Sequence, residues 1–200
     1  GGQDGVAKGA CGGRVAVMKG LNREGVRMDG SVGKSFAYGA QGGILIVQGD
    51  ADSRACIRLS GANVILAGEI EEPIRDEEGS LGTHANLKGF ACEYMTSGQV
   101  MIFGDPGPYA FAGMTGGVVY QLLTPDKGFD LKALQRRMAL GAHVTVRPLV
   151  EDDYEHIRQM IGYYAEALDQ TYQYDTAEEM RARSQNADFL DRFVKILPEV

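Results

Sequence analysis

A glycine-rich segment at residues 30–35, GSVGKS, ends in the Gly-Lys-Ser sequence of nucleotide-binding loops. Such a loop holds phosphates with backbone N–H groups and a lysine, and its pattern requires another glycine five positions before the Gly-Lys pair. Met28 occupies that position here, and no strand followed by a helix is indicated around the segment. We therefore interpret residues 30–35 as a turn and predict no nucleotide site.

Three carboxylates directly follow glycines: Asp50, Glu69 and Asp105. Stacked carboxylates can bind a metal ion or carry out acid–base chemistry, as in polysaccharide lyases. The alternative is a structural turn, in which the Asp side chain accepts hydrogen bonds from nearby backbone amides. A catalytic site would also need an arginine or lysine beside an open cleft, and the basic residues are scattered along the chain. The turn is favoured, and we predict no catalytic, cofactor-binding or metal-binding residue in this chain.

The three cysteines, Cys11, Cys56 and Cys92, form no C-x-x-C pair, and their spacing is unlike that of local zinc or iron–sulfur motifs. Unpaired thiols are typical of a reducing compartment, so we expect a cytoplasmic protein. No apolar run is long enough to predict a membrane span. A net charge of −7 argues against nucleic acid and anionic lipid as partners.

Glycines and small residues recur at intervals of 19 residues through much of the chain. Residues 49–64 align with residues 104–119, and both segments begin with Gly-Asp. The same frame fits residues 30–43 and 85–98. An insertion at residues 70–88 interrupts the period; it is rich in acidic residues and is interpreted as a solvated loop or a contact loop.

Each repeat contains a short apolar run bounded by glycines, which is typical of a buried β-strand. The runs are residues 15–18, 45–47, 64–67, 100–103 and 118–120. Because these strands are too short and too regular for independent hairpins, we expect them to stack as coils about 4.8 Å apart. Stacking aligns two inward columns, Val15, Leu45, Val64, Val100 and Val119, and Val17, Val47, Leu66 and Ile102. The repeats thus predict a mainly β fold, a parallel β-helix over residues 12–122.

The same frame places Cys56 and Cys92 in one column. We predict that both thiols are unbonded, point inward and lie on adjacent coils. Their separation, roughly 5 Å between Cα atoms, would be within disulfide range, but the side chains should point the same way.

The positions between the inward columns are also apolar: Ile46, Ile65, Met101 and Tyr120. A strand with one solvated face should alternate apolar and polar residues. We therefore expect these four side chains to be covered. A helix within the chain, bearing Tyr154, Ile157, Ile161 and Tyr164, is one candidate for the cover, and a partner is the other.

The composition changes near residue 150. Residues 1–149 hold 27 of the 28 glycines, whereas residues 150–200 carry 12 acidic against 5 basic residues. Asp130 is placed to cap a short helix near residues 130–140, and residues 143–147 alternate as a strand. We expect two domains: a repeat domain over residues 1–149 and an acidic α-helical tail over residues 150–200.

The sequence GDPGPYAFAGMTGGVVY at residues 104–120, preceded by ANLKGFACEYMTSG at residues 85–98, resembles the C-terminal GXGXG domain of the glutamate synthase large (alpha) subunit family. The resemblance covers nearly the whole chain, and FVKILP at residues 193–198 fits that family's tail. It implies a right-handed parallel β-helix, a single-stranded solenoid with coils of about 19 residues, followed by a C-terminal α-helical tail. One of the subunits of formylmethanofuran dehydrogenase and those of N-methylglutamate synthase share the repeat, but the repeat together with the tail is more specific to glutamate synthase.

The resemblance implies a structural, non-catalytic domain or subunit of a glutamate synthase-type assembly, which serves glutamate biosynthesis and ammonia assimilation. In that assembly other domains hydrolyse glutamine and carry out the FMN- and iron–sulfur-dependent reductive amination of 2-oxoglutarate. The implied partners are amidotransferase and FMN-binding synthase domains or subunits, with a homo-oligomer as a further option, and no cofactor is expected in this chain.

Two alternatives stay open. One is a scaffold subunit of another GXGXG-containing oxidoreductase complex, similar to formylmethanofuran dehydrogenase or N-methylglutamate synthase. The other is a β-helical carbohydrate-active enzyme. An open groove lined by stacked Asp and Arg side chains would favour the enzyme.

Overall fold

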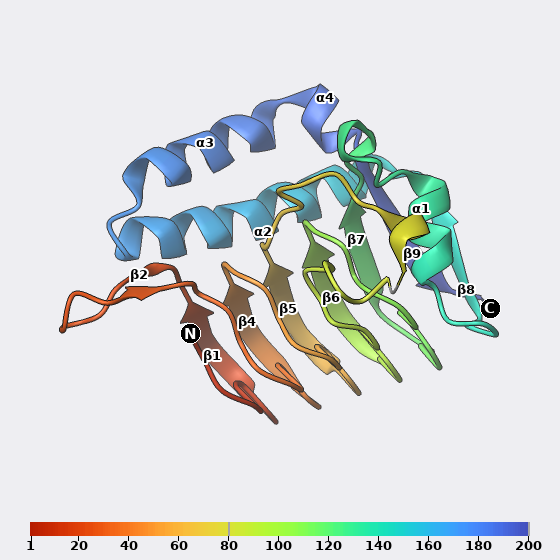
Figure 1. The fold of residues 1–200 in the computed structure, drawn as a ribbon, viewed down its shortest axis with the longest axis horizontal. Coiled ribbons are helices and arrows are strands. Elements are labelled where there is room, and N and C mark those ends of the chain that lie inside the picture. Colours follow the sequence, from red (N-terminus) through yellow and green to blue (C-terminus); the bar gives the residue numbers. More distant parts are fainter. Residues whose placement is uncertain (80, 200) are drawn as a thin grey trace.

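A computed structural model describes residues 1–79 and 81–199. The five strands that carry the repeats lie side by side and parallel (Figure 1): β1 (Cys11–Val17), β4 (Gly42–Val47), β5 (Ser60–Leu66), β6 (Ser97–Ile102) and β7 (Val118–Leu122). Two later strands, β9 (Phe193–Pro198) and β8 (Val144–Arg147), complete a seven-stranded sheet in the order β1-β4-β5-β6-β7-β9-β8. Strand β9 is antiparallel to both of its neighbours, β7 and β8.

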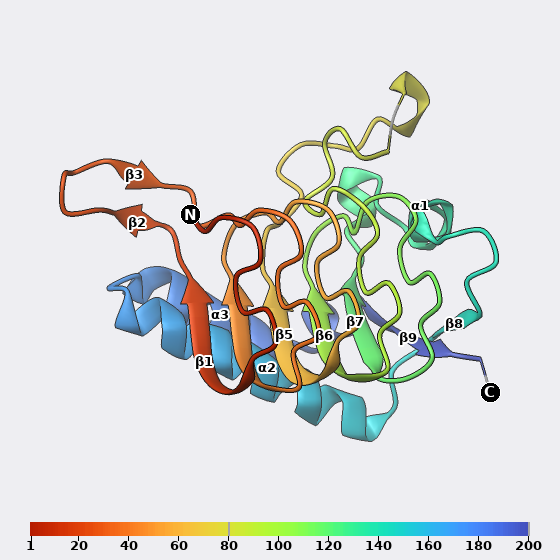
Figure 2. The same ribbon diagram turned by 90° about the horizontal axis from the view of Figure 1, so that it is seen from below.

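An antiparallel hairpin, which the repeats did not indicate, extends from the end of β1 (Figure 2). It consists of β2 (Gly20–Leu21) and β3 (Arg27–Met28). The insertion at residues 70–88 projects from the same side of the stack, and it contains the 3₁₀ turn η1 (Asp76–Glu78). A second 3₁₀ turn, η2 (Pro125–Lys127), follows β7.

The strand register agrees with the alignment of the repeats. Val15 pairs with Leu45, and the column continues through Val64, Val100 and Val119. The second column is likewise paired, in the order Val17, Val47, Leu66 and Ile102. Both predicted columns are confirmed, and so is the predicted strand at residues 143–147, which is β8.

The predicted fold class, a mainly β right-handed parallel β-helix, is wrong. The described residues form a mixed α/β fold with one seven-stranded, mostly parallel sheet and four α-helices. The cause lies between the strands, where the chain runs through successive turns instead of forming further strands. Several turn residues have a positive φ, such as Cys56 at 62° and Phe111 at 65°. Each repeat therefore contributes one strand, and the C-terminal part supplies the helices and antiparallel strands that complete the fold.

The helices are α1 (Leu131–Arg137), α2 (Glu151–Gln170), α3 (Tyr174–Gln185) and α4 (Ala187–Leu190). The side chain of Asp130 caps α1 by accepting a hydrogen bond from the N–H of Ala133 at 2.8 Å, as its position predicted. No helix in the described part of the chain combines the length and apolarity that crossing a bilayer would need. The domain boundary at residue 149 stays a prediction.

The sheet is buried on both faces. On one face the strand columns pack against the turns of their own repeats, where Cys56 and Cys92 are buried and unbonded. On the other face Ile46, Ile65, Met101 and Tyr120 pack against α2 and α3 (Figure 1), and none of the four is more than 1% exposed. The covering helix is thus confirmed, and the expectation that a partner covers this face is wrong.

Candidate functional site

A cleft of about 690 Å³ opens at the carboxyl ends of the parallel strands. Lys19 follows β1, Asp50 follows β4, Glu69 follows β5 and Asp105 follows β6, and all four line the cleft together with the insertion at residues 70–88. Ligands of open parallel sheets bind at this end of the strands. The cleft is therefore the candidate functional site, and it brings together the three carboxylates that sequence reasoning singled out.

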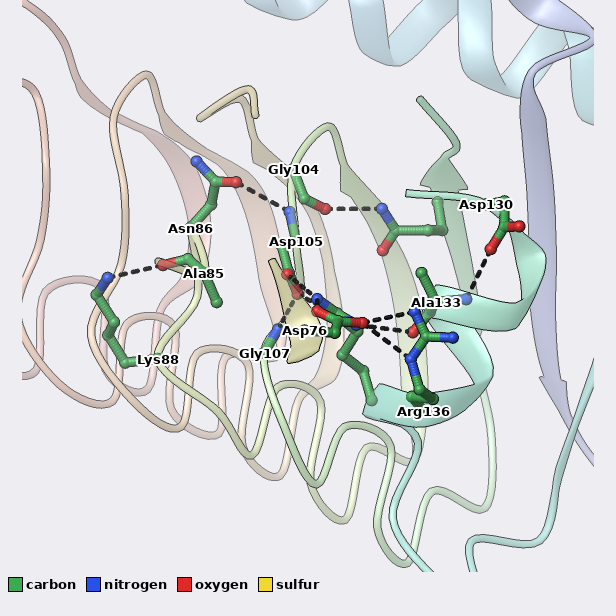
Figure 3. Close-up of polar contacts among 12 residues, drawn as sticks. Asp76, Ala85, Asn86, Lys88, Gly104, Asp105, Gly107, Asp130, Ala133 and Arg136 are labelled. Atoms are coloured by element: carbon green, nitrogen blue, oxygen red, sulfur yellow. Dashed lines mark hydrogen bonds and ion pairs between the residues drawn. The ribbon is translucent and has the colours of Figure 1, made fainter. Parts of the chain in front are cut away.

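Asn86 links the stacked corners to one another. Its Nδ2 donates hydrogen bonds to Asp50 Oδ1 at 2.8 Å and to the carbonyl oxygen of Glu69 at 3.0 Å. Its Oδ1 accepts a hydrogen bond from the N–H of Asp105 at 2.9 Å (Figure 3). Asp105 Oδ1 in turn accepts from the N–H of Gly107 at 2.8 Å, which confirms the predicted turn role of this carboxylate.

A buried arginine from α1 completes the network. The Nε and Nη2 atoms of Arg137 donate to the two carboxylate oxygens of Asp105 at 2.9 and 2.7 Å. Its Nη1 and Nη2 atoms donate to the two carboxylate oxygens of Asp76 at 2.6 and 2.7 Å, and Nη1 also donates to the carbonyl oxygen of Ala133. All five N–H groups of the guanidinium are therefore used within the chain. Arg137 is 1% exposed and Asp105 is 3% exposed.

These ion pairs shift the pKa of Asp76 and the pKa of Arg137. The hydrogen bond from Arg137 is the largest cause of a lowered pKa for Asp76, and Arg136 acts in the same direction, while burial opposes both. Burial alone would lower the pKa of Arg137, but its bonds to Asp76 and Asp105 outweigh that effect and raise the pKa. The carboxylate of Asp76 stays ionised and the guanidinium of Arg137 stays protonated at neutral pH. The insertion is thus tied to the stack by a permanent ion-pair network.

The other two cleft carboxylates also have partners within the chain. Glu69 forms an ion pair with Arg183 of α3, with 2.7 Å between Oε1 and Nη1. Asp50 Oδ1 accepts a hydrogen bond from Asn86 Nδ2, as described above. The arrangement joins neighbouring repeats, the insertion and two helices. It acts as a brace, because each of the three carboxylates that follow the strands accepts a hydrogen bond or forms an ion pair within the chain.

The remaining sequence motifs lie elsewhere or take structural roles. In the segment at residues 30–35, Ser31 Oγ accepts a hydrogen bond from the N–H of Asp50, and turns rather than a helix follow Ser35. Within residues 1–79 and 81–199, no three His, Cys, Asp or Glu side chains are grouped so as to hold a metal ion.

The two buried cysteines lie in neighbouring repeats, as the 19-residue frame predicted. The N–H of Cys92 donates to the carbonyl oxygen of Ala55. A hydrogen bond between the two thiols, together with burial, raises the pKa of Cys56 well above its usual value. The thiol of Cys56 is therefore neutral and is not activated as a nucleophile. Cys92 is a buried core residue.

Sequence reasoning missed three members of the network: Asp76, Asn86 and Arg137. The acidic pattern around Asp76 indicates only a solvated or contact loop, and its partner Arg137 lies 61 positions away. Two adjacent arginines at the end of a predicted short helix were the available signal. They did not identify a partner, because no local spacing connects α1 to the insertion.

Comparison of the sequence with known protein families assigns the chain to one of them. The GXGXG motif family matches residues 77–199. The chain belongs to the GXGXG family. The glutamate synthase [NADPH] large chain of Bacillus subtilis (strain 168) is 28% identical over 197 residues, which cover 98% of this chain and 11% of that protein.

Two plant relatives are more similar over a shorter length. The chloroplastic ferredoxin-dependent glutamate synthase 2 of Arabidopsis thaliana is 32% identical over 155 residues, which cover 74% of this chain and 8% of that protein. The chloroplastic ferredoxin-dependent glutamate synthase of Spinacia oleracea is 34% identical over the same length, with the same coverage. This GXGXG chain therefore spans about a tenth of the length of the curated relatives that it matches.

Proposed function

We propose that this chain is a structural, non-catalytic domain or subunit of a glutamate synthase-type assembly. The observation that carries the proposal is the match of 98% of the chain to one region of a glutamate synthase large chain. In the proposed assembly, amidotransferase and FMN-binding synthase domains hydrolyse glutamine and reductively aminate 2-oxoglutarate. The present chain braces those domains, and FMN and an iron–sulfur cluster are held by the partners.

The pairing inside the cleft supports a bracing role. A catalytic acid or base must be free to exchange a proton with a substrate. Asp105 is instead held by Arg137, Glu69 by Arg183 and Asp50 by Asn86. The stacked Asp and Arg side chains that would favour a carbohydrate-active enzyme are present, but the arginine is buried and its donors are already used. A cytoplasmic location is part of the proposal, and the buried, unbonded Cys56 and Cys92 are consistent with it.

The first test uses the purified chain alone. We expect no ammonia release from glutamine and no glutamate formation from 2-oxoglutarate, ammonia and a reductant. Ammonia release that follows the chain through independent purification steps would overturn the non-catalytic role.

The second test is assembly. Co-expressed with amidotransferase and FMN-binding synthase polypeptides from the same source, the chain should co-purify with them and should be required for their full glutamate-forming activity. Within that complex, Asp50→Asn and Glu69→Gln keep the shape of the cleft and remove the charges of these two residues. We expect glutamate formation to be unchanged in both variants, and loss of turnover without loss of assembly would make the cleft catalytic instead.

A further inference from the structure

Two columns of exposed or half-buried residues lie in the turns that connect the strands, on the side of the sheet opposite α2. Figure 2 shows these turns. The first column is Ser35, Arg54, Phe90 and Tyr109, and the second is Gly39, Arg58, Tyr94 and Gly113. Hydrogen bonds define both: Arg54 N–H donates to the carbonyl oxygen of Gly89, and Tyr94 N–H donates to that of Ala112. We call these two columns the turn face.

The backbone of the turn face is left-handed at residues with large side chains. Arg58 has a φ of 53° and Tyr94 a φ of 55°, while Gly39 and Gly113 hold the same conformation in the same column. A non-glycine residue in this region costs about 1–2 kcal/mol. Tyr94 and Tyr109 are 52% and 56% exposed, and Arg58 is exposed as well. The buried turn residues Cys56 and Phe111 share this conformation, so the repeat itself requires it. An exposed arginine or tyrosine at such a position costs stability that a glycine there would not.

The side chains of the turn face are cationic and aromatic. The guanidinium of Arg54 lies 5.5 Å from the ring centre of Phe90, and that ring stacks on Tyr109 at 5.0 Å. Arg58 makes no ion pair with any residue that the structure describes. The nearby acid Glu93 pairs with Arg54, and Asp52 keeps its charge while it accepts the N–H of Ser53. Arg58 is therefore the arginine of this face whose charge no described residue pairs with. Although the whole chain has a net charge of −7, this face presents arginines and tyrosines.

We propose that the turn face is a docking surface for an acidic protein segment of a partner domain. Arginine and tyrosine are enriched at the centres of protein interfaces, and a cationic face attracts and orients a segment that carries carboxylates. Arg54 lies over the stacked rings of Phe90 and Tyr109, so an acidic segment would meet both a positive charge and a flat apolar surface here. The identity of the partner as a synthase domain rests on the proposed function, whereas the acidic chemistry of the segment rests on this face alone.

The probe is decaglutamate, titrated into the isotope-labelled full chain and followed by the backbone amide signals. We expect the largest shifts at residues 54–58 and 90–94. The variant Arg54→Glu/Arg58→Glu should weaken binding by about fivefold or more. The control Arg23→Glu/Arg27→Glu makes the same change of charge on the exposed β2–β3 hairpin and should keep binding within about twofold.

Each alternative outcome has a defined meaning. If the two double variants weaken decaglutamate equally, or if the shifts lie outside the turn face, the proposal is wrong. If a DNA decamer binds this face more tightly than decaglutamate, the partner class is wrong. If Arg54→Glu/Arg58→Glu does not fold, Lys34→Glu/Arg58→Glu replaces it, because Lys34 lies beside the turn face and is exposed. Failure to co-purify with synthase polypeptides would overturn the proposed function and leave the peptide result standing.

Discussion

The two faces of the sheet are buried by different parts of the chain. One face packs against turns that belong to the same repeats, so that Leu45 and Val64 meet Cys56 and Leu59 within one period of the sequence. The other face packs against helices from beyond the last repeat, so that Ile46 and Ile65 meet side chains of α2. The first core is periodic and local, whereas the second depends on long-range contacts. The difference predicts how each face responds to mutation.

Each face is also closed by a buried charged group. On the turn side it is Arg137, which is held by Asp76 and Asp105. On the helix side it is Asp153 in the first turn of α2, which accepts hydrogen bonds from Tyr120 at 3.0 Å and Lys195 at 2.6 Å. The first group ties the insertion to the stack, and the second ties α2 to strands β7 and β9. Removing either one tests whether the two faces are stabilised independently.

The largest effect is expected for Arg137→Leu. The change leaves the buried carboxylate of Asp105 without its counter-charge, and breaking a buried ion pair by removing one partner costs about 3–5 kcal/mol. Urea unfolding should show this loss, together with faster amide exchange in the insertion. The matched control is Arg136→Ala, which removes an exposed partner of Asp76 and should cost less than about 1 kcal/mol. Equal losses in the two variants would contradict a special role for the buried arginine.

The second prediction compares neighbours on one strand, Ile65→Ala and Leu66→Ala. Ile65 is 0% exposed on the helix side and Leu66 is 2% exposed on the turn side. Each change should lower the free energy of unfolding by about 2–5 kcal/mol, because both create a cavity in a packed core. Hydrogen exchange should separate them: Ile65→Ala should speed exchange in α2, and Leu66→Ala in the turns around Cys56 and Cys92. Identical exchange patterns would mean that the two cores unfold as one unit.

How much of this fold could be predicted from sequence follows from the same comparison. The register of the strands was predictable, because a period of 19 residues repeats the same apolar positions, such as Val64 and Val100. The burial of Ile65 was predictable as well, because the residues on both faces of its strand are apolar. The positive φ at Arg58 was not, since arginine carries no local signal for a left-handed turn. That conformation recurs in the turns between the strands, which take the place of the further strands that a β-helix needs.

The cleft shows a different limit. Its carboxylates were visible as Gly-Asp and Gly-Glu pairs, but their partners were not. Arg137 and Arg183 reach the cleft from helices that are distant in sequence, and only the packing of those helices brings them to Asp105 and Glu69. A sequence pattern identifies an acid at a turn, whereas three-dimensional packing decides whether that acid is free.

The third prediction concerns pH and the helix side. Burial alone would raise the pKa of Asp153, but hydrogen bonds from Lys195, the N–H of Val150 and Tyr120 outweigh it and lower that pKa. The pKa of Asp153 is lower in the folded protein than in the unfolded chain, where it is about 3.9. The ionised carboxylate therefore stabilises the fold at pH values above about 3.9, and this contribution is lost as the pH falls through the pKa of the folded state. Stability measured from pH 7 downward should therefore fall less steeply below about pH 4 in Asp153→Asn than in the wild type.

At neutral pH, Asp153→Asn should cost about 1–2 kcal/mol, because it weakens hydrogen bonds to a charged group. The control is Asp152→Asn, an exposed neighbour in the same helical turn, which should cost less than about 1 kcal/mol. If Asp153→Asn is as stable as the wild type at pH 7, the link between α2 and Lys195 contributes nothing to the second core.

The smallest effect is expected at the turn face, where a loss of side chain should not destabilise the fold. Arg58→Gly relieves a left-handed residue, worth about 1–2 kcal/mol, and adds freedom to the unfolded chain, worth about 0.4–1 kcal/mol. The net result should lie between no change and a gain of about 1.6 kcal/mol, measured by urea unfolding. Lys132→Gly, on the exposed side of α1, is the control and should cost about 1 kcal/mol, because glycine is unfavourable inside a helix.

A stable Arg58→Gly variant that binds decaglutamate more weakly would show that Arg58 contributes to binding and lowers the stability of the fold. A variant that loses more than about 1 kcal/mol would instead assign Arg58 to the stability of the turns.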